Sequence, residues 1–361
     1  MKKLIALALS LAIVGGAAPT MTKYAPDTAI TASAETYNDV LTYKITSENT
    51  ITITGCDTSA TEVIIPASID GLPVTSIGEE AFVDCYLKSI TIPDSVTSIG
   101  DAAFYDCSSL ESIIIPDSVT SIGDSAFCNC TSLDSITIPD SVTSISYGAF
   151  EFCSSLTSIT ILNPDCEIHD SPTISNGYHV GEGFYFDGTI YGYENSTAQA
   201  YAEEYGYNFE SIGIFGNFGE NFTWVLDNEG TLTIIGTGDM TDYSYGESPF
   251  FDNTDIKKIV IKSGVISIGN WVFFDCTSLE SVTIPDSVTS IGDNAFRYCT
   301  SLESVTIPDS VTSIGDNAFA YCPSLESITI PDSVTSIGEE AFSNCTSLES
   351  ITIPDSVTSI G

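Results

Sequence analysis

One 23-residue unit, repeated along most of the chain, restricts the folds that this sequence can adopt. The copy at residues 307–329 reads Ile-Pro-Asp-Ser-Val-Thr-Ser-Ile-Gly-Asp-Asn-Ala-Phe-Ala-Tyr-Cys-Pro-Ser-Leu-Glu-Ser-Ile-Thr. Its proline, phenylalanine and cysteine recur in two groups with a step of 23, apart from one step of 22. The phenylalanines are Phe82, Phe104, Phe127, Phe150, Phe273, Phe296, Phe319 and Phe342. A fixed period in the twenties is typical of a solenoid.

A single unit cannot fold alone. Each copy offers about seven apolar side chains, worth roughly 1.5–3 kcal/mol each when buried. Fixing each backbone residue costs on the order of 1–2 kcal/mol. Stability must therefore come from stacking each unit on its neighbours.

The segment 325–331 of the unit predicts a half-buried strand. Leu325, Ile328 and Ile330 should point inward, whereas Ser327 and Thr329 should point outward. The following proline ends the strand because it has no N–H for the ladder. The fold expected is a mostly β solenoid with about 23 residues per turn.

The pattern Leu-x-x-Ile-x-Ile-Pro, with one Ala-Phe-x-x-Cys segment per turn, resembles the leucine-rich repeat of the BspA type. The resemblance covers most of residues 62–162 and 256–361. Members of that family are typically secreted or surface-attached bacterial proteins without catalytic residues in the repeats, and several are adhesins. The resemblance therefore implies export and binding rather than catalysis.

The N-terminus has the layout of a secretory signal. Lys2 and Lys3 precede the apolar stretch 4–14, which is too short to span a bilayer. Residues 32–34, Ala-Ser-Ala, are the best cleavage site and would leave Glu35 as the first residue; a site near Ala17 is the alternative. An uncleaved membrane anchor is a further reading of this segment. No second apolar stretch approaches membrane length, so we expect no membrane insertion of the mature chain.

The chain is strongly acidic, with a formal net charge of −40. Removing residues 1–34 takes away three lysines and one aspartate, which leaves −42. Such a surface repels nucleic acid and anionic membranes. The carboxylates lie mainly in two slots of each repeat, after Pro and after Ile-Gly. Rows of stacked aspartates would repel one another and could gain from calcium, but no oxygen-rich loop has calcium-site spacing, so no cofactor is assigned.

Eight of the 11 cysteines fill one slot of the repeat. They could be buried free thiols or a disulfide ladder. Parallel side chains in neighbouring turns aim the same way, which favours free thiols that pack as small hydrophobes. The other three, Cys56, Cys128 and Cys166, lack the spacing of a metal site.

Irregular segments divide the repeats into two tandem capped arrays. Two strands, 41–46 and 51–55, predict a hairpin cap over residues 35–61, ahead of array 1 at residues 62–162. Residues 163–213 are expected to form its C-terminal cap, with a short helix that has Ser196 as N-cap and ends at Gly206. A second hairpin, 222–226 with 231–235, predicts another β cap at residues 214–255 before array 2 at 256–361.

Aromatic residues are dense in the segment 184–209. One reading is a carbohydrate-stacking platform, and the other is a set of rings that seals the end of array 1. The tyrosine spacing suits a packed helix and favours the second reading.

The last copy stops midway through a unit and leaves apolar residues without a covering turn. We therefore expect the natural protein to continue beyond Gly361.

No catalytic constellation is visible. The two histidines, His169 and His179, lie near neither a nucleophile elbow nor a metal-ligand pair. The serines occupy repeat positions and are expected to form a hydroxyl stripe on the exposed strand face.

If the repeats bind a partner, the variable residues before each slot cysteine are the candidates. Tyr, Phe and Arg are the residue types that carry interface energy; unconstrained surface drift is the alternative. The candidate binding surface consists of Tyr105, Asp106, Glu151, Phe152, Phe274, Asp275, Arg297, Tyr298, Tyr321 and Asn344.

These observations predict an exported, non-catalytic scaffold that binds an extracellular protein or glycan. The alternatives are an accessory module of a larger secreted enzyme or cell-surface assembly, and a structural spacer. A regular, acidic, hydroxyl-lined face is compatible with either kind of ligand.

Overall fold

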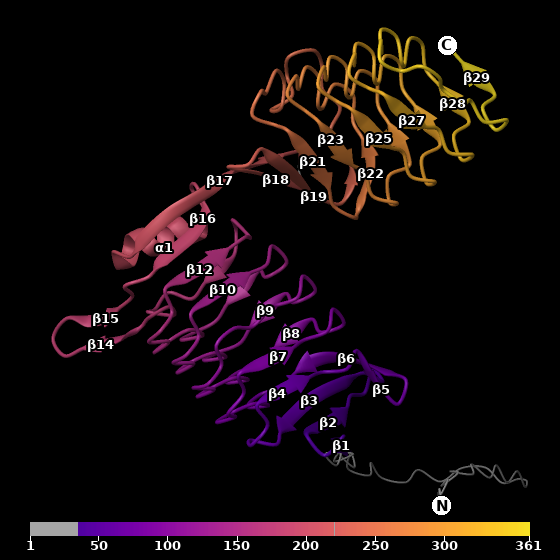
Figure 1. Cartoon of the computed structure of the whole chain (residues 1–361). Helices are drawn as coiled ribbons and strands as arrows, with labels where there is room; N and C mark the ends of the chain where they lie inside the picture. The colour runs from indigo at the N-terminus through magenta and orange to yellow at the C-terminus, as the bar shows by residue number, and fades with distance from the viewer. Residues whose placement is uncertain (1–34, 220) are drawn as a thin grey trace, which may run out of the picture. The chain divides into compact units, whose positions relative to one another are not determined.

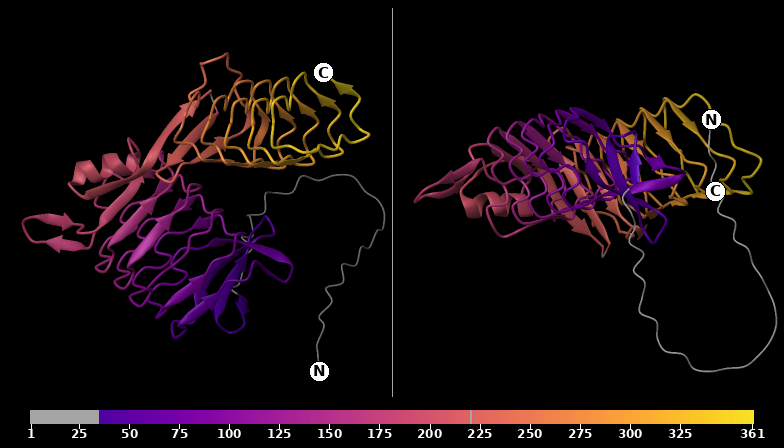
Figure 2. Two further views of the ribbon diagram at one scale, coloured as in Figure 1. Left: turned by 45° about the horizontal axis from the view of Figure 1, so that its top comes forward. Right: turned by 90° about the horizontal axis from the view of Figure 1, so that it is seen from below.

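The computed structural model describes residues 35–219 and 221–361, and in them the repeats form a β-solenoid (Figure 1). The predicted signal segment, residues 1–34, lies outside the described residues. Successive turns stack in parallel within each array, which the two further views also show (Figure 2). No helix in the described part of the chain is long and apolar enough to cross a membrane.

Most turns contribute two short strands, although the sequence pattern predicts only one. In array 2, β25 (Ser304–Thr306) is the predicted strand and β26 (Ser313–Ile314) follows the Pro-Asp turn. Both pair in parallel with the same positions of the next turn, Ser304 with Ser327 and Ser313 with Ser336. The step of 23 in sequence thus becomes one strand spacing in space.

The strands form ladders along the solenoid. In the first half they are β1 (Glu35–Tyr37), β2 (Leu41–Ile45), β3 (Ile51–Cys56), β4 (Glu62–Ile64), β5 (Ser68–Ile69), β6 (Leu72–Ile77), β7 (Ser89–Thr91), β8 (Ser98–Ile99), β9 (Ser121–Ile122), β10 (Ser135–Ile138), β11 (Ser144–Ile145), β12 (Ser158–Ile161), β13 (Glu167–Ile168), β14 (Gly177–His179), β15 (Gly183–Tyr185) and β16 (Thr189–Tyr193). After helix α1 (Thr197–Tyr205) come β17 (Asn208–Phe218), β18 (Phe222–Asp227), β19 (Thr231–Gly236), β20 (Gly238–Asp239), β21 (Lys258–Ile261), β22 (Val265–Ile268), β23 (Ser281–Thr283), β24 (Ser290–Ile291), β25, β26, β27 (Ser327–Thr329), β28 (Ser336–Ile337) and β29 (Ser359–Ile360).

Burial follows the predicted alternation. Leu325, Ile328 and Ile330 are buried, whereas Ser327 and Thr329 are exposed. The apolar residues of this turn therefore line the inside of the coil and its hydroxyl residues face solvent, as the half-buried strand requires.

The third side of each turn, the Ala-Phe-x-x-Cys segment, is held without strands. The Phe N–H donates to the Ala carbonyl of the next turn, for example from Phe104 to Ala126 at 2.7 Å and from Phe296 to Ala318 at 2.8 Å. The phenylalanine rings stack from turn to turn with centroids 5.1–5.2 Å apart in array 1. These contacts make the Phe row a continuous buried column.

The slot cysteines are free thiols in the described residues. From the second turn of array 1 onward, each Sγ donates to the carbonyl oxygen of a phenylalanine in the preceding turn. The donors and distances are Cys107 (3.0 Å), Cys130 (3.2 Å), Cys153 (3.2 Å), Cys276 (3.3 Å), Cys299 (3.3 Å), Cys322 (3.3 Å) and Cys345 (3.1 Å). Cysteine therefore fills a small apolar slot and also satisfies a buried carbonyl.

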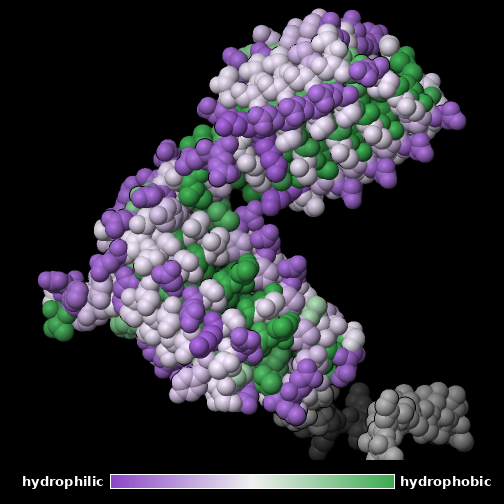
Figure 3. Space-filling model, in the orientation of Figure 1, coloured by the Kyte–Doolittle hydropathy of each residue, from purple (hydrophilic) through white to green (hydrophobic). Residues whose placement is uncertain are grey.

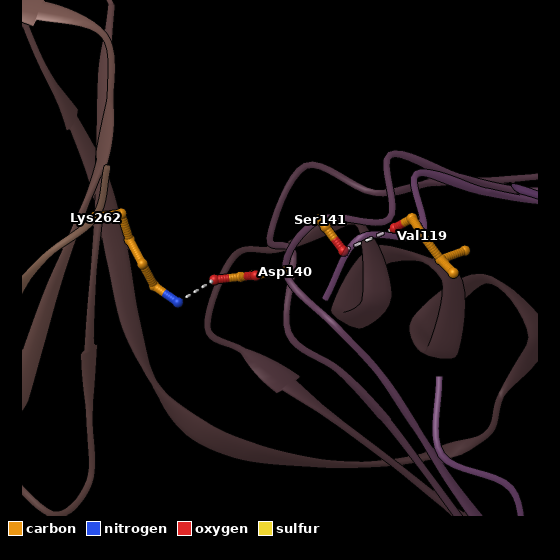
Figure 4. Close-up of polar contacts among 4 residues, drawn as sticks. All are labelled: Val119, Asp140, Ser141 and Lys262. Atoms are coloured by element: carbon orange, nitrogen blue, oxygen red, sulfur yellow. Dashed lines mark hydrogen bonds and ion pairs between the residues drawn. The ribbon is translucent and has the colours of Figure 1, made fainter. Parts of the chain in front are cut away.

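The polar repeat residues also bind the turn before them. The Pro-Asp-Ser serine donates to the valine carbonyl of the previous turn, as Ser141 does to Val119 at 2.7 Å (Figure 4). The carboxylate after Ile-Gly accepts a hydrogen bond from a backbone N–H of the next turn. For example, Asp316 Oδ1 lies 2.7 Å from the N of Glu339. The sequence pattern predicts that the carboxylates of this row repel one another. In the structure they accept hydrogen bonds from the neighbouring turn.

Glycine in the Ile-Gly pair permits the close stacking of turns. A Cβ placed on Gly315 would lie 2.6 Å from the carbonyl carbon of Gly292 and 2.7 Å from the N of Asp293. A side chain at this position would force the turns apart.

The two predicted hairpins and the predicted helix form. Strands β2 and β3 pair antiparallel ahead of array 1, and β18 and β19 do so ahead of array 2. Helix α1 begins after Ser196, whose Oγ accepts from the N–H of Gln199 at 3.2 Å, and ends at Gly206 with φ 70°. Tyr201 on its buried face donates to the carbonyl of Ser171 at 2.9 Å. This packing supports the reading in which the helix tyrosines seal an end of array 1.

Strand β17 continues the sheet from one array's cap into the next. Its first half pairs in parallel with β16 and its second half pairs antiparallel with β18, the change falling at Gly213. The boundary predicted between residues 213 and 214 therefore falls within one continuous strand. The buried apolar side chains nevertheless form two clusters, one ending in the segment 198–209 and the other beginning at Phe218.

Charged residues remain at the surface. Hydrophilic residues form a row along the visible face of array 2 (Figure 3). Lys262 Nζ lies 3.4 Å from Asp140 Oδ2, the ion pair drawn in Figure 4. Both side chains are partly exposed, and pairs of this kind contribute about 0–1 kcal/mol.

Candidate binding site

Each Ala-Phe turn holds two residues in the left-handed region, four positions apart. The second of these immediately precedes the slot cysteine, and we call it the left-handed slot. Its occupants are Asp84 (φ 56°), Asp106 (58°), Asn129 (62°), Phe152 (59°), Asp275 (61°), Tyr298 (64°), Tyr321 (60°) and Asn344 (59°). Asp and Asn tolerate this backbone conformation, whereas a bulky aromatic residue is strained in it. The three aromatic residues in this slot are therefore expected to have a packing or binding role that offsets the strain.

In array 2 the aromatic slot residues belong to a cluster. Tyr245 packs edge-on against Trp271, with ring centroids 5.8 Å apart, and against Phe274 at 5.3 Å. Phe274 also contacts Trp271 at 4.9 Å and Tyr298 at 5.5 Å. Phe274 is buried and forms the floor, whereas Tyr245 is 66% exposed and forms a wall.

Arg297, the only arginine of the chain, lies among these rings. Its guanidinium carbon is 5.1 Å from the ring centroid of Tyr298 and 5.3 Å from that of Tyr321. The two tyrosine rings stack on each other at 4.7 Å. Arg297 Nη1 donates to Asn294 Oδ1 at 3.0 Å, whereas Nε is buried without an acceptor among the described residues. Cation–π contacts and one hydrogen bond therefore hold the guanidinium in place.

These residues surround an open cavity of about 490 Å³. It is lined by Tyr245, Trp271, Phe274, Asp275, Arg297 and Tyr298, which together with Tyr321 we call the aromatic–arginine site. Burial, and secondarily the charge of Asp252, raise the pKa of the Asp275 carboxyl. Ring faces, a cationic donor and a carboxylate acceptor converge here. That combination is typical of ligand-binding sites.

The structure brings five of the ten sequence-predicted residues into this site: Phe274, Asp275, Arg297, Tyr298 and Tyr321. Asn344 is not among the lining residues; its Nδ2 donates to Ser343 Oγ at 3.0 Å.

The four predicted residues of array 1 have other surroundings. Phe152 packs against Phe184 of β15 at 5.7 Å, and Glu151 is half-buried, which raises the pKa of its carboxyl. Asp106 accepts from Asn129 Nδ2 at 2.6 Å, and Tyr105 is 39% exposed. These contacts give Phe152 and Asp106 packing roles within array 1.

Sequence reasoning missed Trp271 and Tyr245. Trp271 occupies the first left-handed position of its turn, where other copies hold Ala102, Ser125 or Asn294, so the same comparison of copies could have found it. Tyr245 lies in the loop between β20 and β21, outside the repeat pattern, and carries no sequence signal of its own.

The histidines lie in other surroundings. His169 Nδ1 is 3.3 Å from Ser171 Oγ, and the His179 ring stacks on Tyr185 at 4.3 Å. Within residues 35–219 and 221–361, no group of three or more His, Cys, Asp or Glu side chains is placed to hold a metal ion.

Several solved structures resemble this chain. A leucine-rich cell surface protein from Faecalibacterium prausnitzii is 27% identical, with 88% of this chain and 94% of that chain covered and a TM-score of 0.32. A leucine-rich repeat protein from Bacteroides capillosus is 34% identical over 36% of this chain and 98% of that chain, with a TM-score of 0.34. The pneumococcal vaccine antigen PcpA is 19% identical, with 91% and 93% covered and a TM-score of 0.34. Among curated proteins, none matches.

A family model supplies the classification. The model of the BspA type leucine rich repeat region matches residues 55–172 and 246–361, which is more than half of the chain. These ranges contain both arrays and the period, strand pattern and Ala-Phe-x-x-Cys turns described above. The chain therefore belongs to the BspA-type leucine-rich repeat family.

Proposed function

We propose that this protein is an exported, non-catalytic repeat scaffold that binds an extracellular protein or glycan through the aromatic–arginine site of array 2. The single observation that carries the proposal is the aromatic cluster built around Arg297, whose two tyrosines occupy the left-handed slot that five of the eight copies fill with Asp or Asn. Interface energy is concentrated in Trp, Tyr and Arg, which are the residues gathered here.

The backbone strain supports this proposal. A left-handed aromatic residue costs on the order of 1–2 kcal/mol relative to a residue suited to that conformation. Stacking of the Tyr298 and Tyr321 rings returns about 0.5–1.5 kcal/mol. Both tyrosines carry this strain but share one stacked contact, so packing offsets only part of it and gives no stability gain for keeping two tyrosines where most turns keep Asn or Asp. Binding supplies the missing reason.

Export is part of the same proposal. Residues 1–34 carry the predicted signal segment, and the family is one of bacterial repeat proteins with surface-protein relatives among the solved structures. We expect the mature protein to begin at Glu35. N-terminal sequencing of the secreted protein tests this, and a protein retained in the cytoplasm with residues 1–34 intact would contradict it.

The binding test uses a solid-phase panel of collagen, laminin, mucin and a printed set of neutral and acidic glycans. Tyr298 and Tyr321 are both changed to Asn, the residue that Asn129 and Asn344 place in the same slot. The matched control is Phe152→Asn, which removes an aromatic residue from this slot in array 1.

We expect the double variant to lose at least tenfold in affinity for the panel members that wild type binds, while Phe152→Asn retains binding. Equal binding by wild type and the double variant would overturn the proposal. Absence of saturable wild-type binding across the whole panel would also count against it.

A further inference from the structure

Among the described residues, Arg297 forms no ion pair, although this chain is rich in carboxylates. The chain has 49 Asp and Glu residues and only this one arginine. Among the described residues, the ion pair is that of Lys262 with Asp140, and the side-chain partner of Arg297 is the neutral amide of Asn294. A guanidinium held against two stacked tyrosines and beside a neutral amide keeps its charge free for an external anion.

The guanidinium also has spare donors. It carries five N–H groups in a rigid fork that fits a carboxylate. One of them is used by Asn294, and Nε is buried without an acceptor. Arg297 is one of the residues that line the cavity. Because its Nε is buried, an incoming carboxylate would meet the η nitrogens. The position is fixed before binding, which lowers the entropic cost of capturing a ligand.

The backbone around the site offers a peptide little to bind. The N–H groups of Trp271, Asp275 and Tyr298 donate to the next turn at 2.9, 2.8 and 3.0 Å. An extended peptide that adds a strand needs unpaired main-chain groups, and these are taken. Recognition must therefore come from side chains: ring faces, one cation and one carboxylate.

Those side chains suit a sugar ring. The face of an aromatic ring is negatively polarised, so it attracts the positively polarised C–H groups on one face of a pyranose. Tyr245 and Trp271 both line the cavity, and their ring planes lie at 89° to each other. Tyr245 is exposed. The Asp275 carboxylate is an acceptor for sugar hydroxyls. Arg297 then selects a sugar that carries a carboxylate.

The overall charge limits how acidic the glycan can be. A net charge of −40 repels a polyanion along its whole length. A single carboxylate is attracted by Arg297 at contact distance, while more distant charges are screened within about 8 Å at physiological salt. The field of the protein thus favours an acidic sugar on an otherwise neutral glycan.

We propose that the aromatic–arginine site binds a terminal acidic monosaccharide, a pyranose bearing one carboxylate, at the end of an otherwise neutral glycan. This inference rests on the proposed function and names the ligand class of that same site.

The test compares three probes by isothermal titration calorimetry with the protein from residue 35 onward. These are 3′-sialyllactose, which ends in an acidic sugar, lactose, which is its neutral remainder, and heparin, a polyanion. We expect saturable binding of sialyllactose, at least tenfold weaker binding of lactose, and weaker binding of heparin. Equal affinity for lactose and sialyllactose, tighter binding of heparin, or no binding of sialyllactose would overturn the proposal.

Two variants separate the charge from the packing. Arg297→Gln removes the cation, and Asn294→Asp leaves Arg297 in place but supplies an internal carboxylate 3.0 Å from Nη1. Position 294 is left-handed, a conformation that Asp tolerates. The affinity of both variants for 3′-sialyllactose should be at least tenfold lower than that of the wild type. Phe152→Asn should bind it with wild-type affinity. Unchanged binding by a folded Asn294→Asp protein would contradict the role of Arg297.

The two proposals can fail separately. If the Tyr298 and Tyr321 double variant loses binding to a panel protein while no acidic sugar binds, the ligand class is wrong and the binding function stands. If the double variant keeps all panel binding, the site itself is wrong.

Discussion

The two arrays use one repeat and differ in what they place on it. In array 1 the left-handed slot holds Asp84, Asp106 and Asn129, two of which are linked by a 2.6 Å hydrogen bond, and its aromatic residue, Phe152, packs on β15. In array 2 the same slot holds two adjacent tyrosines with Arg297 over their rings. The backbone conformation is the same in both.

The interiors of the arrays are also alike. The Phe rings stack at 5.1–5.2 Å in array 1 and at 5.3–5.7 Å in array 2. The buried residues of each copy therefore build the scaffold, while two variable positions per turn differ between the arrays. Function should therefore follow these positions rather than the fold.

The largest expected effect comes from breaking the shared interior. Phe104→Ala in array 1 and Phe296→Ala in array 2 each remove a fully buried ring from the column. We expect each to lower the free energy of unfolding by about 3–5 kcal/mol. Urea titration measures this, with Tyr105→Ala, a 39% exposed residue, as the control. A loss in one array only would show that the interiors are not equivalent.

Exchanging residues of the left-handed slot tests whether tyrosine is strained there in both arrays. Asp106→Tyr places a tyrosine in a left-handed slot whose neighbouring turns hold Asp84 and Asn129, and it breaks the hydrogen bond to Asn129. We therefore expect the free energy of unfolding to fall by about 2–3 kcal/mol. Tyr298→Asn relieves strain as it loses stacking, so its effect should stay within about 1 kcal/mol. Thermal unfolding of the two variants gives the comparison. Similar losses in both would refute the strain argument.

Alkaline pH should weaken both arrays through the slot cysteines. Burial raises the pKa of the Cys153 and Cys276 thiols from 9.0 to about 12. Between pH 9 and 12 the unfolded thiol loses its proton while the folded one keeps it, so stability falls as pH rises, by about 1.4 kcal/mol per pH unit for each thiol. Unfolding at pH 8 and pH 10, with Cys153→Ala and Cys276→Ala as references, measures this. Equal stability of the wild type at the two pH values would be inconsistent with buried neutral thiols.

The smallest effect concerns the hydroxyl bonds between turns. Ser141 donates to Val119 at 2.7 Å in array 1, and Ser310 donates to Val288 at 2.6 Å in array 2. Replacing either serine with Ala should cost about 0.5–1.5 kcal/mol. The exposed Ser327→Ala is the control, and chemical denaturation is sensitive enough to compare the three. A control loss equal to the other two would mean that these bonds add nothing.

The solenoid, its period and its inward-facing residues could be predicted from the residue pattern alone. A repeated unit that cannot bury its apolar face alone has to stack on its copies, and Leu325, Ile328 and Ile330 are therefore buried. Local chemistry also identified helix α1, because the Ser196 cap and Gly206 stop depend on neighbouring residues only.

Features that depend on contacts between turns could not be predicted from the residue pattern. The second strand of each turn exists because stacking supplies its hydrogen bonds, which two-residue segments such as Ser313–Ile314 do not reveal in sequence. The continuation of β17 past Gly213 was hidden for the same reason. Tyr245 lies in a loop outside the repeats and reaches Trp271 and Arg297 only in the folded chain. Comparing the copies therefore predicts the repeat residues of the candidate site but not Tyr245.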